Sequence, residues 1–171
     1  EIDADAYEQC VHNFENSDWG DRLFCYHASL EEFVNEIDDT YDLIISNPPF
    51  YTDDFKSGNK ARDKARFEEA LPFTELLSSV SKLLSSTGQL NVIIPFSEEE
   101  NFISIAKKEE LHPSRILRVR GQESSPLKRS LICFTFKEKS VDDIRELTIE
   151  IIRHQYTEDY INLTKDFYLK L

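Results

Sequence analysis

The tetrapeptide Asn47-Pro48-Pro49-Phe50 combines residue types that could activate an amine. It directly follows Tyr41–Ser46 (YDLIIS), an apolar run of strand length. The exocyclic amine of a nucleobase is a poor nucleophile because its lone pair is delocalised into the ring. The side-chain oxygen of Asn47 and the backbone carbonyl of Pro48 could accept both amine hydrogens and draw the nitrogen toward a tetrahedral shape. The tetrapeptide therefore predicts chemistry on an exocyclic amine.

The prolines and the aromatic residue favour the same chemistry. Successive prolines fix φ and lack N–H groups, so the turn presents oxygens without a competing donor. Phe50 could stack on a base, which is worth about 1–3 kcal/mol. Orientation toward an electrophilic methyl group would then supply most of the rate. A rigid turn at the end of a strand is the alternative, but an ordinary turn requires neither two prolines nor an aromatic residue.

Other chemistries find less support among the residues. Neither Cys nor His lies near the tetrapeptide, which argues against covalent pyrimidine methylation and zinc deamination. Cys10, Cys25 and Cys133 are widely spaced and have no partner histidine at zinc spacing. Asp53 and Asp54 lack a further carboxylate at useful spacing. We therefore expect no metal site, and the cysteine usage fits a reducing cytosol.

The elements that must position this tetrapeptide alternate along the chain. Apolar periodicity predicts helices over residues 4–17, 30–37 and 72–87 and a further helix that starts at 97. It predicts strands over residues 22–27, 41–46, 89–95, 116–119 and 130–136. Residues 146–154 are rich in β formers, and 160–171 are expected to form an aromatic-rich helix or cap on the sheet. This order predicts one α/β domain over residues 1–171, with a mostly parallel sheet and an antiparallel hairpin near its C-terminal end. Gly88 is expected to end the helix that starts at Pro72.

Ligands of such sheets bind beyond the carboxyl ends of the strands. Glu1, Ala28-Ser29 and Asn47 each follow a predicted strand, so we expect them to line one crevice. The sequence contains no methionine, and Glu1-Ile2-Asp3 resembles the end of a strand that enters a helix. We therefore expect a fragment that lacks its first strand. No apolar run approaches the roughly 20 residues of a membrane helix.

The net charge of −13 conceals an uneven distribution. Residues 1–54 contain 15 acidic residues and one basic residue, Arg22. Segments 56–66 and 112–129 together hold 10 of the 20 basic residues and 2 of the 33 acidic ones. Two basic clusters that follow the tetrapeptide along the chain favour a surface that follows a phosphate backbone, with solvated loops as the alternative. The expected contacts are Lys56, Lys60, Arg62, Lys64 and Arg66 in the first segment, and Lys128 and Arg129 in the second.

The tetrapeptide at a strand end resembles the catalytic motif of class I S-adenosylmethionine-dependent amino-methyltransferases. Longer segments are similar to the bacterial tRNA1(Val) adenine-N6 methyltransferase family across nearly the whole chain: "YDLIISNPPFY", "ARFEEALPFTELL", "KLLSSTGQLNVIIP", "PLKRSLICFTF" and "HQYTEDYINLTKDFYLKL". The last of these segments is the most specific to the family. Two departures are Phe67, where a histidine is expected, and Phe50, where tyrosine is commoner.

The resemblance implies a Rossmann-like fold and methyl transfer from S-adenosylmethionine to the N6 amine of adenine 37 in a tRNA. It implies that Asn47, Pro48, Pro49 and Phe50 form the catalytic turn. Glu1 would hold the cofactor ribose, with Ala28 and Ser29 near the cofactor adenine and Asn47 also facing the cofactor. The glycine-rich loop would precede residue 1, since Gly20, Gly58, Gly88 and Gly121 are scattered.

Three alternatives remain open from the residues alone. They are an N6-adenine DNA methyltransferase, a protein-glutamine N5-methyltransferase, and an inert fragment that does not bind the cofactor. The basic segments disfavour the second alternative. A cytoplasmic monomer with tRNA as its partner, and without membrane or metal, is the expected state.

Overall fold

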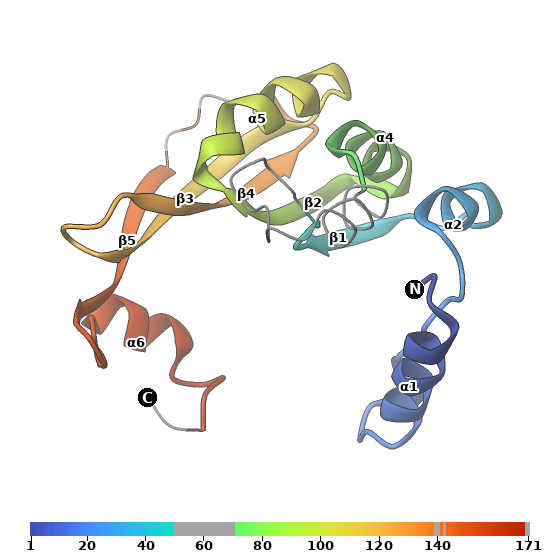
Figure 1. Cartoon of the computed structure of the whole chain (residues 1–171). Helices are drawn as coiled ribbons and strands as arrows, with labels where there is room; N and C mark the ends of the chain where they lie inside the picture. Colours follow the sequence, from blue (N-terminus) through green and yellow to red (C-terminus); the bar gives the residue numbers. More distant parts are fainter. Residues whose placement is uncertain (50–70, 139–140, 142, 170–171) are drawn as a thin grey trace, which may run out of the picture. The chain divides into compact units, whose positions relative to one another are not determined.

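A computed structural model describes residues 1–49, 71–138, 141 and 143–169. The chain forms two compact units, residues 1–40 and residues 41–171, and each is described by itself (Figure 1).

The first unit contains two helices and one short 3-10 turn. Helix α1 spans Ala4–Glu15, turn η1 spans Gly20–Arg22, and helix α2 spans Leu30–Glu36. The Asp3 side chain accepts a 2.8 Å hydrogen bond from the Ala6 amide and so caps α1, as its position before the apolar repeat predicts.

The predicted strand over 22–27 does not form in this unit. The segment includes the last residue of η1 and then extended backbone, as at Leu23. A strand requires a ladder of hydrogen bonds to a neighbour. Here only single backbone contacts to Glu1 are present, from Glu1 N to Tyr26 O at 3.0 Å and from Ala28 N to Glu1 O at 3.2 Å.

The second unit is built on a six-stranded sheet in the order β1-β2-β4-β3-β5-β6. Its strands are β1 (Tyr41–Ser46), β2 (Leu84–Pro95), β3 (His112–Gln122), β4 (Leu127–Thr135), β5 (Asp143–Ile152) and β6 (Gln155–Tyr156). Its helices are α4 (Phe73–Leu83), α5 (Glu99–Lys108) and α6 (Glu158–Thr164), and turn η3 (Phe96–Glu98) precedes α5. The α/β class is confirmed.

The sheet contains more antiparallel pairing than the alternation of helices and strands predicts. β1 pairs with β2, and β3 with β5, in parallel. The expected hairpin is β3–β4, whose connection of residues 123–126 is too short for a crossover, so these strands are antiparallel. β4 then lies between β3 and β2 and is antiparallel to both. The short β6 turns back on β5, also antiparallel.

The core lies between the sheet and helices α4 and α5, which cover one of its faces (Figure 1). The stripe of α4 at Leu76, Leu77, Val80 and Leu83 is buried, as its spacing predicts. Phe102 of α5 is fully buried between two other rings, 4.8 Å from Phe73 and 5.7 Å from Phe134 between ring centroids. These contacts hold the helix layer against β2 and β4.

Gly88 does not end α4, contrary to the expectation. The helix ends at Leu83, and Gly88 lies within β2. The register between β1 and β2 shifts here, since Tyr41 pairs with Leu84 but Leu43 with Gln89. A Cβ on Gly88 would lie 2.9 Å from the Tyr41 carbonyl oxygen and 2.8 Å from Leu84 Cδ1. Gly88 is therefore required for the close approach of two backbones where β1 begins.

The end of the chain packs less tightly than the sequence predicts. Tyr160 and Ile161 of α6 are half-buried, but Leu163 is 53% exposed and Phe167 is 86% exposed. Helix α6 ends at Thr164, so the last aromatic residues lie beyond it. Of these residues, Tyr168 is 55% exposed.

Replacement of Gly88 by alanine should destabilise the protein. The added methyl group cannot avoid the Tyr41 carbonyl without a shift of β1 or β2, so we expect the free energy of unfolding to fall by about 1–3 kcal/mol. Gly121→Ala in β3 is the matched control, because a Cβ at that position would have no other atom within 4 Å. Urea denaturation measures both variants, and equal stability of the two would contradict the assigned role of Gly88.

Candidate active site at the end of strand β1

The turn after β1 presents the Asn47 side chain at the edge of the sheet. Ser46 ends β1 in register with Val92 of β2, and the chain then leaves the ladder. Asn47 is exposed, Pro48 is buried and Pro49 is exposed. Within the part of the chain that the structure describes, no hydrogen bond engages the Asn47 side chain. The amide is thus available to a ligand and does not support neighbouring backbone.

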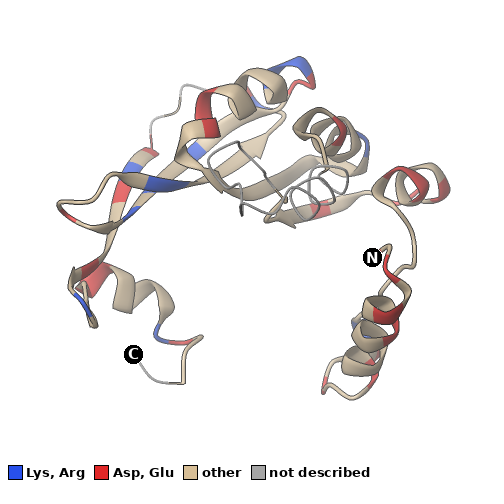
Figure 2. Ribbon diagram, viewed as in Figure 1, with Lys and Arg blue, Asp and Glu red and all other residues tan. Residues whose placement is uncertain are grey.

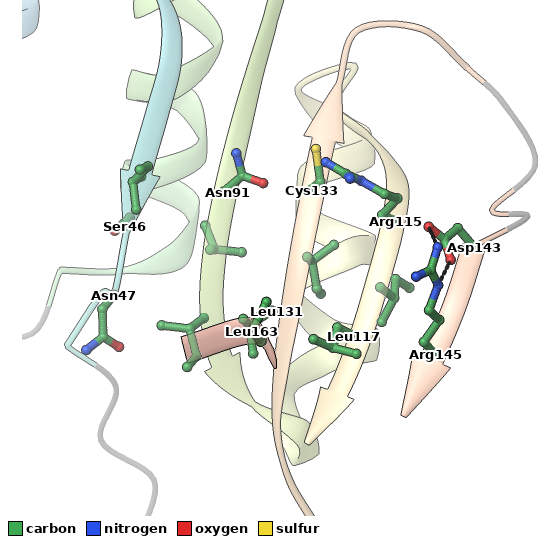
Figure 3. Close-up of a pocket in the computed structure, with 15 residues that line it drawn as sticks. Ser46, Asn47, Asn91, Arg115, Leu117, Leu131, Cys133, Asp143, Arg145 and Leu163 are labelled. Carbon is green, nitrogen blue, oxygen red and sulfur yellow. Dashed lines mark hydrogen bonds and ion pairs between the residues drawn. The ribbon is translucent and has the colours of Figure 1, made fainter. Parts of the chain in front are cut away.

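Asn47 also lines a cavity of about 510 Å³ on the sheet face opposite α4 and α5 (Figure 3). Alternation along the strands forms its floor, because Leu90 and Ile94 face the helices while Asn91 and Ile93 face the cavity. The floor is mostly apolar, with Asn47 at one end and an Asp143–Arg145 ion pair of 2.5 Å at the other. This volume is within the range of small-ligand pockets.

Several predicted residues lie outside the described part of the chain. Phe50 is one of them, and so is the whole first basic cluster: Lys56, Lys60, Arg62, Lys64 and Arg66. Their expected roles stay predictions. The same holds for the departure at Phe67.

Lys128 and Arg129 lie at the sheet edge from which Asn47 emerges. Arg129 is in register with Pro95, the last residue of β2, and β2 runs parallel to β1. Lys128 is exposed, and Arg129 is half-buried with its Nη1 donating to the Lys128 carbonyl at 3.1 Å. This position is compatible with the expected contact to the phosphate backbone, which stays a prediction.

The rest of the second basic cluster is partly neutralised. Arg118 forms an ion pair with Glu99 at 2.7 Å, and Arg120 forms a very short one with Glu146. Figure 2 shows how acidic residues accompany the basic ones on these elements, with α1 and α2 carrying mainly acidic side chains. A count of charges along the sequence therefore exaggerates the positive surface of this segment.

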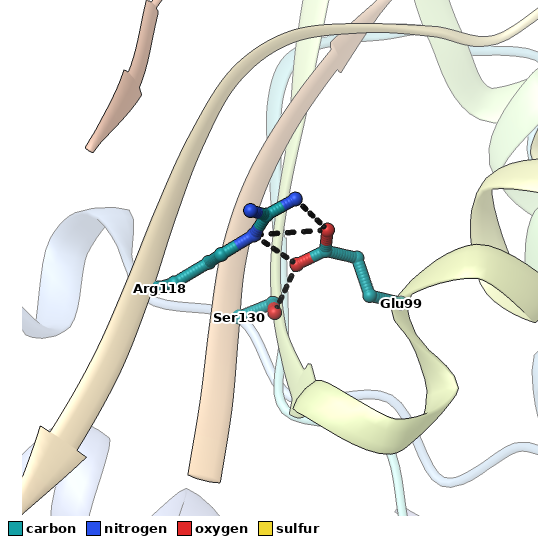
Figure 4. A network of polar contacts seen from close by, with 3 residues as sticks. All are labelled: Glu99, Arg118 and Ser130. Carbon is teal, nitrogen blue, oxygen red and sulfur yellow. Dashed lines mark hydrogen bonds and ion pairs between the residues drawn. The ribbon is translucent and has the colours of Figure 1, made fainter. Parts of the chain in front are cut away.

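Sequence reasoning missed a buried polar network at the same edge (Figure 4). Glu99 is 5% exposed and accepts hydrogen bonds from Arg118 of β3 and Ser130 of β4. The sequence predicts a capping box at Ser97 for this helix. Instead η3 precedes α5, and no side chain caps it. Strand register aligns Arg118 with Ser130, and the packing of α5 on the sheet brings Glu99 to them. A single sequence displays neither.

The cofactor residues predicted by resemblance belong to the first unit. Ala28 N donates to the Glu1 carbonyl, so these two residues lie together. One carboxylate oxygen of Glu1 accepts from the Asp3 amide at 2.9 Å. The second carboxylate oxygen of Glu1 is open to solvent. Such a carboxylate is suited to accept hydrogen bonds from the hydroxyls of a ribose. The expectation that Asn47, in the second unit, lines the same crevice stays a prediction.

Ser29 has a structural role that the resemblance did not indicate. Its N–H and Oγ–H both donate to Glu32 Oε2 at 2.8 Å, and Glu32 N donates back to Ser29 Oγ at 3.2 Å. This capping box starts α2 directly after Ala28. The hydrogen bond from the Ser29 backbone, followed by that from its side chain, lowers the pKa of the Glu32 carboxyl.

The described residues offer no other obvious chemistry. Among them, no three His, Cys, Asp or Glu side chains gather as a metal site would require. None of the described helices combines the length and apolar composition needed to cross a membrane. The arrangement at Asn47 is instead suited to hold and orient a hydrogen-bond donor such as an amine.

Curated relatives match the chain over its whole length. A protein from Christiangramia forsetii named tRNA1(Val) (adenine(37)-N6)-methyltransferase is 58% identical over 100% of this chain and 72% of its own length. Proteins of the same name from Flavobacterium johnsoniae and Bacteroides fragilis are 57% and 40% identical and are covered over 73% and 72% of their lengths. No model of a protein family matches the chain.

A solved structure supports the fold assignment. A predicted O-methyltransferase from Agrobacterium tumefaciens matches with a TM-score of 0.63 and 14% identity, covering 96% of this chain and 74% of that one. At this identity the similarity concerns the fold alone. It agrees with the Rossmann-like fold that the resemblance implies.

The Ser29–Glu32 box should respond to pH in one direction. The pKa of Glu32 is lowered in the folded state. The ionised Glu32 side chain therefore contributes fully to folding stability above its pKa in the unfolded chain, and this contribution is lost as the pH falls through its pKa in the folded protein. NMR titration of Glu32 should give a pKa below the ordinary glutamate value, and Ser29→Ala should raise it. An unchanged Glu32 pKa in Ser29→Ala would exclude the hydrogen bond from the Ser29 hydroxyl as a cause, since the backbone N–H donor remains in that variant.

Proposed function

Because the chain belongs to the tRNA1(Val) (adenine(37)-N6)-methyltransferase family, we propose that it methylates the N6 amine of adenine 37 in tRNA1(Val). The protein is a methyltransferase. S-adenosylmethionine would supply the electrophilic methyl group when bound. The proposal concerns which residues of this chain act and how.

The assignment of the acceptor site rests on the exposed Asn47 side chain, which has no hydrogen-bond partner among the described residues. A rigid, paired strand leads to it, and the buried Pro48 fixes the chain after it. The side-chain oxygen of Asn47 and the carbonyl of Pro48 would each accept one hydrogen of the adenine amine. Two acceptors orient the nitrogen lone pair toward the methyl carbon, and this orientation accounts for much of the rate. No charged base is needed, because the amine loses its proton after it has gained the methyl group.

The remaining residues would hold the two substrates. Phe50 would stack on the extruded adenine, and Pro49 would keep the turn rigid. Glu1 would accept hydrogen bonds from the ribose hydroxyls of the cofactor, with Ala28 and Ser29 beside the cofactor adenine. Ser29 would act there through the position of α2, since its hydroxyl is already engaged by Glu32.

The basic residues would bind the tRNA backbone. Lys128 and Arg129 are suited to this by their position at the same edge as Asn47. From the sequence, the further contacts are Lys56, Lys60, Arg62, Lys64 and Arg66. Neutralisation of phosphates releases counterions, so binding should weaken as the salt concentration rises.

Asn47→Ala in the full-length protein should nearly abolish methylation and leave cofactor affinity nearly intact. Loss of one of the two acceptors should lower kcat by about 100-fold to 1000-fold. Transfer of labelled methyl to a tRNA1(Val) transcript, with calorimetry for the cofactor, measures both quantities. Asn101→Ala is the matched control, because Asn101 is exposed on α5 and bonds only to Glu98.

The substrate is tested in the same assay. A transcript with guanine at position 37, a DNA oligonucleotide of the anticodon-loop sequence and a glutamine-containing peptide replace the tRNA in turn. Only the unaltered tRNA should accept the methyl group. Wild-type turnover by Asn47→Ala would disprove the acceptor role, and preferential methylation of DNA or peptide would disprove the substrate.

The double variant Lys128→Ala, Arg129→Ala should weaken tRNA binding and reduce its salt dependence. Loss of two phosphate contacts lowers the slope of log K against log salt by about 1.4–1.8. Lys107→Ala, Lys108→Ala is the matched control. It removes the same charge from an exposed pair at the end of α5, the helix that leads from the β2 end to the opposite edge of the sheet. Equal slopes for the two double variants would refute the contacts.

A further inference from the structure

Among the described residues, Glu99 is the one carboxylate that is buried. Polar side chains from two strands, β3 and β4, contact it. Arg118 Nε donates to its two oxygens at 3.1 and 3.2 Å, and Arg118 Nη2 donates to Oε1 at 2.7 Å. Ser130, which is fully buried, donates a very short hydrogen bond to Oε2. Figure 4 shows the carboxylate of α5 between the side chains of β3 and β4.

Stability alone does not account for such a network. Burial of a carboxylate and a guanidinium costs several kcal/mol per ion, and apolar residues of similar volume often stabilise a core as well or better. The network does fix geometry, because a bidentate guanidinium pair tolerates little displacement. The hydrogen bond to Glu99, more than the adjacent charge, raises the pKa of Arg118 above its ordinary value.

The position of the network relates it to the substrate edge. Strand register aligns Ile94, Ser130 and Arg118 across the sheet. This row lies two residues beyond the row of Ser46 and Val92, toward the edge where Asn47 emerges. Ser130 directly follows Arg129, and Arg118 also lies 5.6 Å from the centroid of the Phe96 ring in η3. The network thus connects the end of β2, the start of α5 and the start of β4.

We propose that Glu99 is a positioning residue for tRNA. Through Ser130 and Arg118 it holds the start of β4, so that Lys128 and Arg129 face the RNA backbone in one register. This inference depends on the proposed function in one respect, the assignment of Lys128 and Arg129 as phosphate contacts. Without the carboxylate, the start of β4 loses its connection to α5 while Asn47 is unaffected.

Glu99→Gln tests the proposal in the full-length enzyme. It keeps the shape of the side chain but loses the charge that Arg118 requires. We expect KM for tRNA to rise about tenfold, with kcat and KM for S-adenosylmethionine within twofold of wild type. Glu100→Gln is the matched control, since it removes the same charge from the adjacent, exposed position of α5 and should change none of these values. A wild-type KM for tRNA in Glu99→Gln would overturn the proposal.

A second variant separates positioning from stability. Glu99→Met, Arg118→Leu and Ser130→Ala together replace the network by apolar contacts, which should restore the melting temperature. KM for tRNA should stay raised, because the apolar contacts impose no register on β4. Recovery of both quantities together would overturn the proposal.

The Lys128→Ala, Arg129→Ala variant distinguishes the two possible failures. Normal tRNA binding by that variant would refute the phosphate contacts on which the inference depends. Weakened binding by that variant, combined with a normal KM in Glu99→Gln, would refute the positioning role alone.

Discussion

The parallel pairing of β1 with β2 is the constraint on which the rest of the second unit depends. Strand β1 leads the chain to one edge of the sheet and ends at Ser46, which is in register with Val92. The ladder to β2 pairs the backbone of β1 on one side up to that point, and Pro48 is buried directly after it. Asn47 is therefore exposed between two fixed positions. An amide held in this way can orient a substrate amine without first losing its own conformational freedom.

The layer of α4 and α5 maintains that pairing. The buried stripe of α4 and the Phe102 ring pack on the face formed by Leu90 and Ile94. The other face carries the cavity at Asn47. One face of β2 thus supplies cohesion and the opposite face supplies a surface for a ligand, as the two-residue periodicity of a strand allows.

The insertion of β4 between β2 and β3 determines the electrostatics of the edge. It brings Arg129 beside the end of β2 and brings Ser130 and Arg118 beneath Glu99. Part of a basic segment is consequently used inside the protein, where its charge is compensated. The part that remains at the surface is small and localised. A localised positive surface on an acidic protein limits the orientations in which a polyanion can bind.

The sequence by itself determined the α/β class, the presence of strands β1 and β2, the stripe of α4, the β3–β4 hairpin and the motif at Asn47. Each depends on local periodicity, a short connection or adjacent residue types, all of which are visible along one chain. The sequence did not determine the burial of β1: an apolar strand predicts burial on both faces, but β1 lies at the edge of the sheet, and Leu43 and Ile45 are 54% and 75% exposed. The strand predicted over 22–27 does not form, and local sequence cannot reveal this, because a strand also requires a neighbouring strand to pair with. The end of α4 was also misplaced, since Gly88 is required by the approach of Tyr41 from a distant segment. Only the tertiary structure decided the insertion of β4 between β3 and β2 and the Glu99–Arg118–Ser130 network. These features depend on register between strands, and register is set by packing among residues far apart in the sequence.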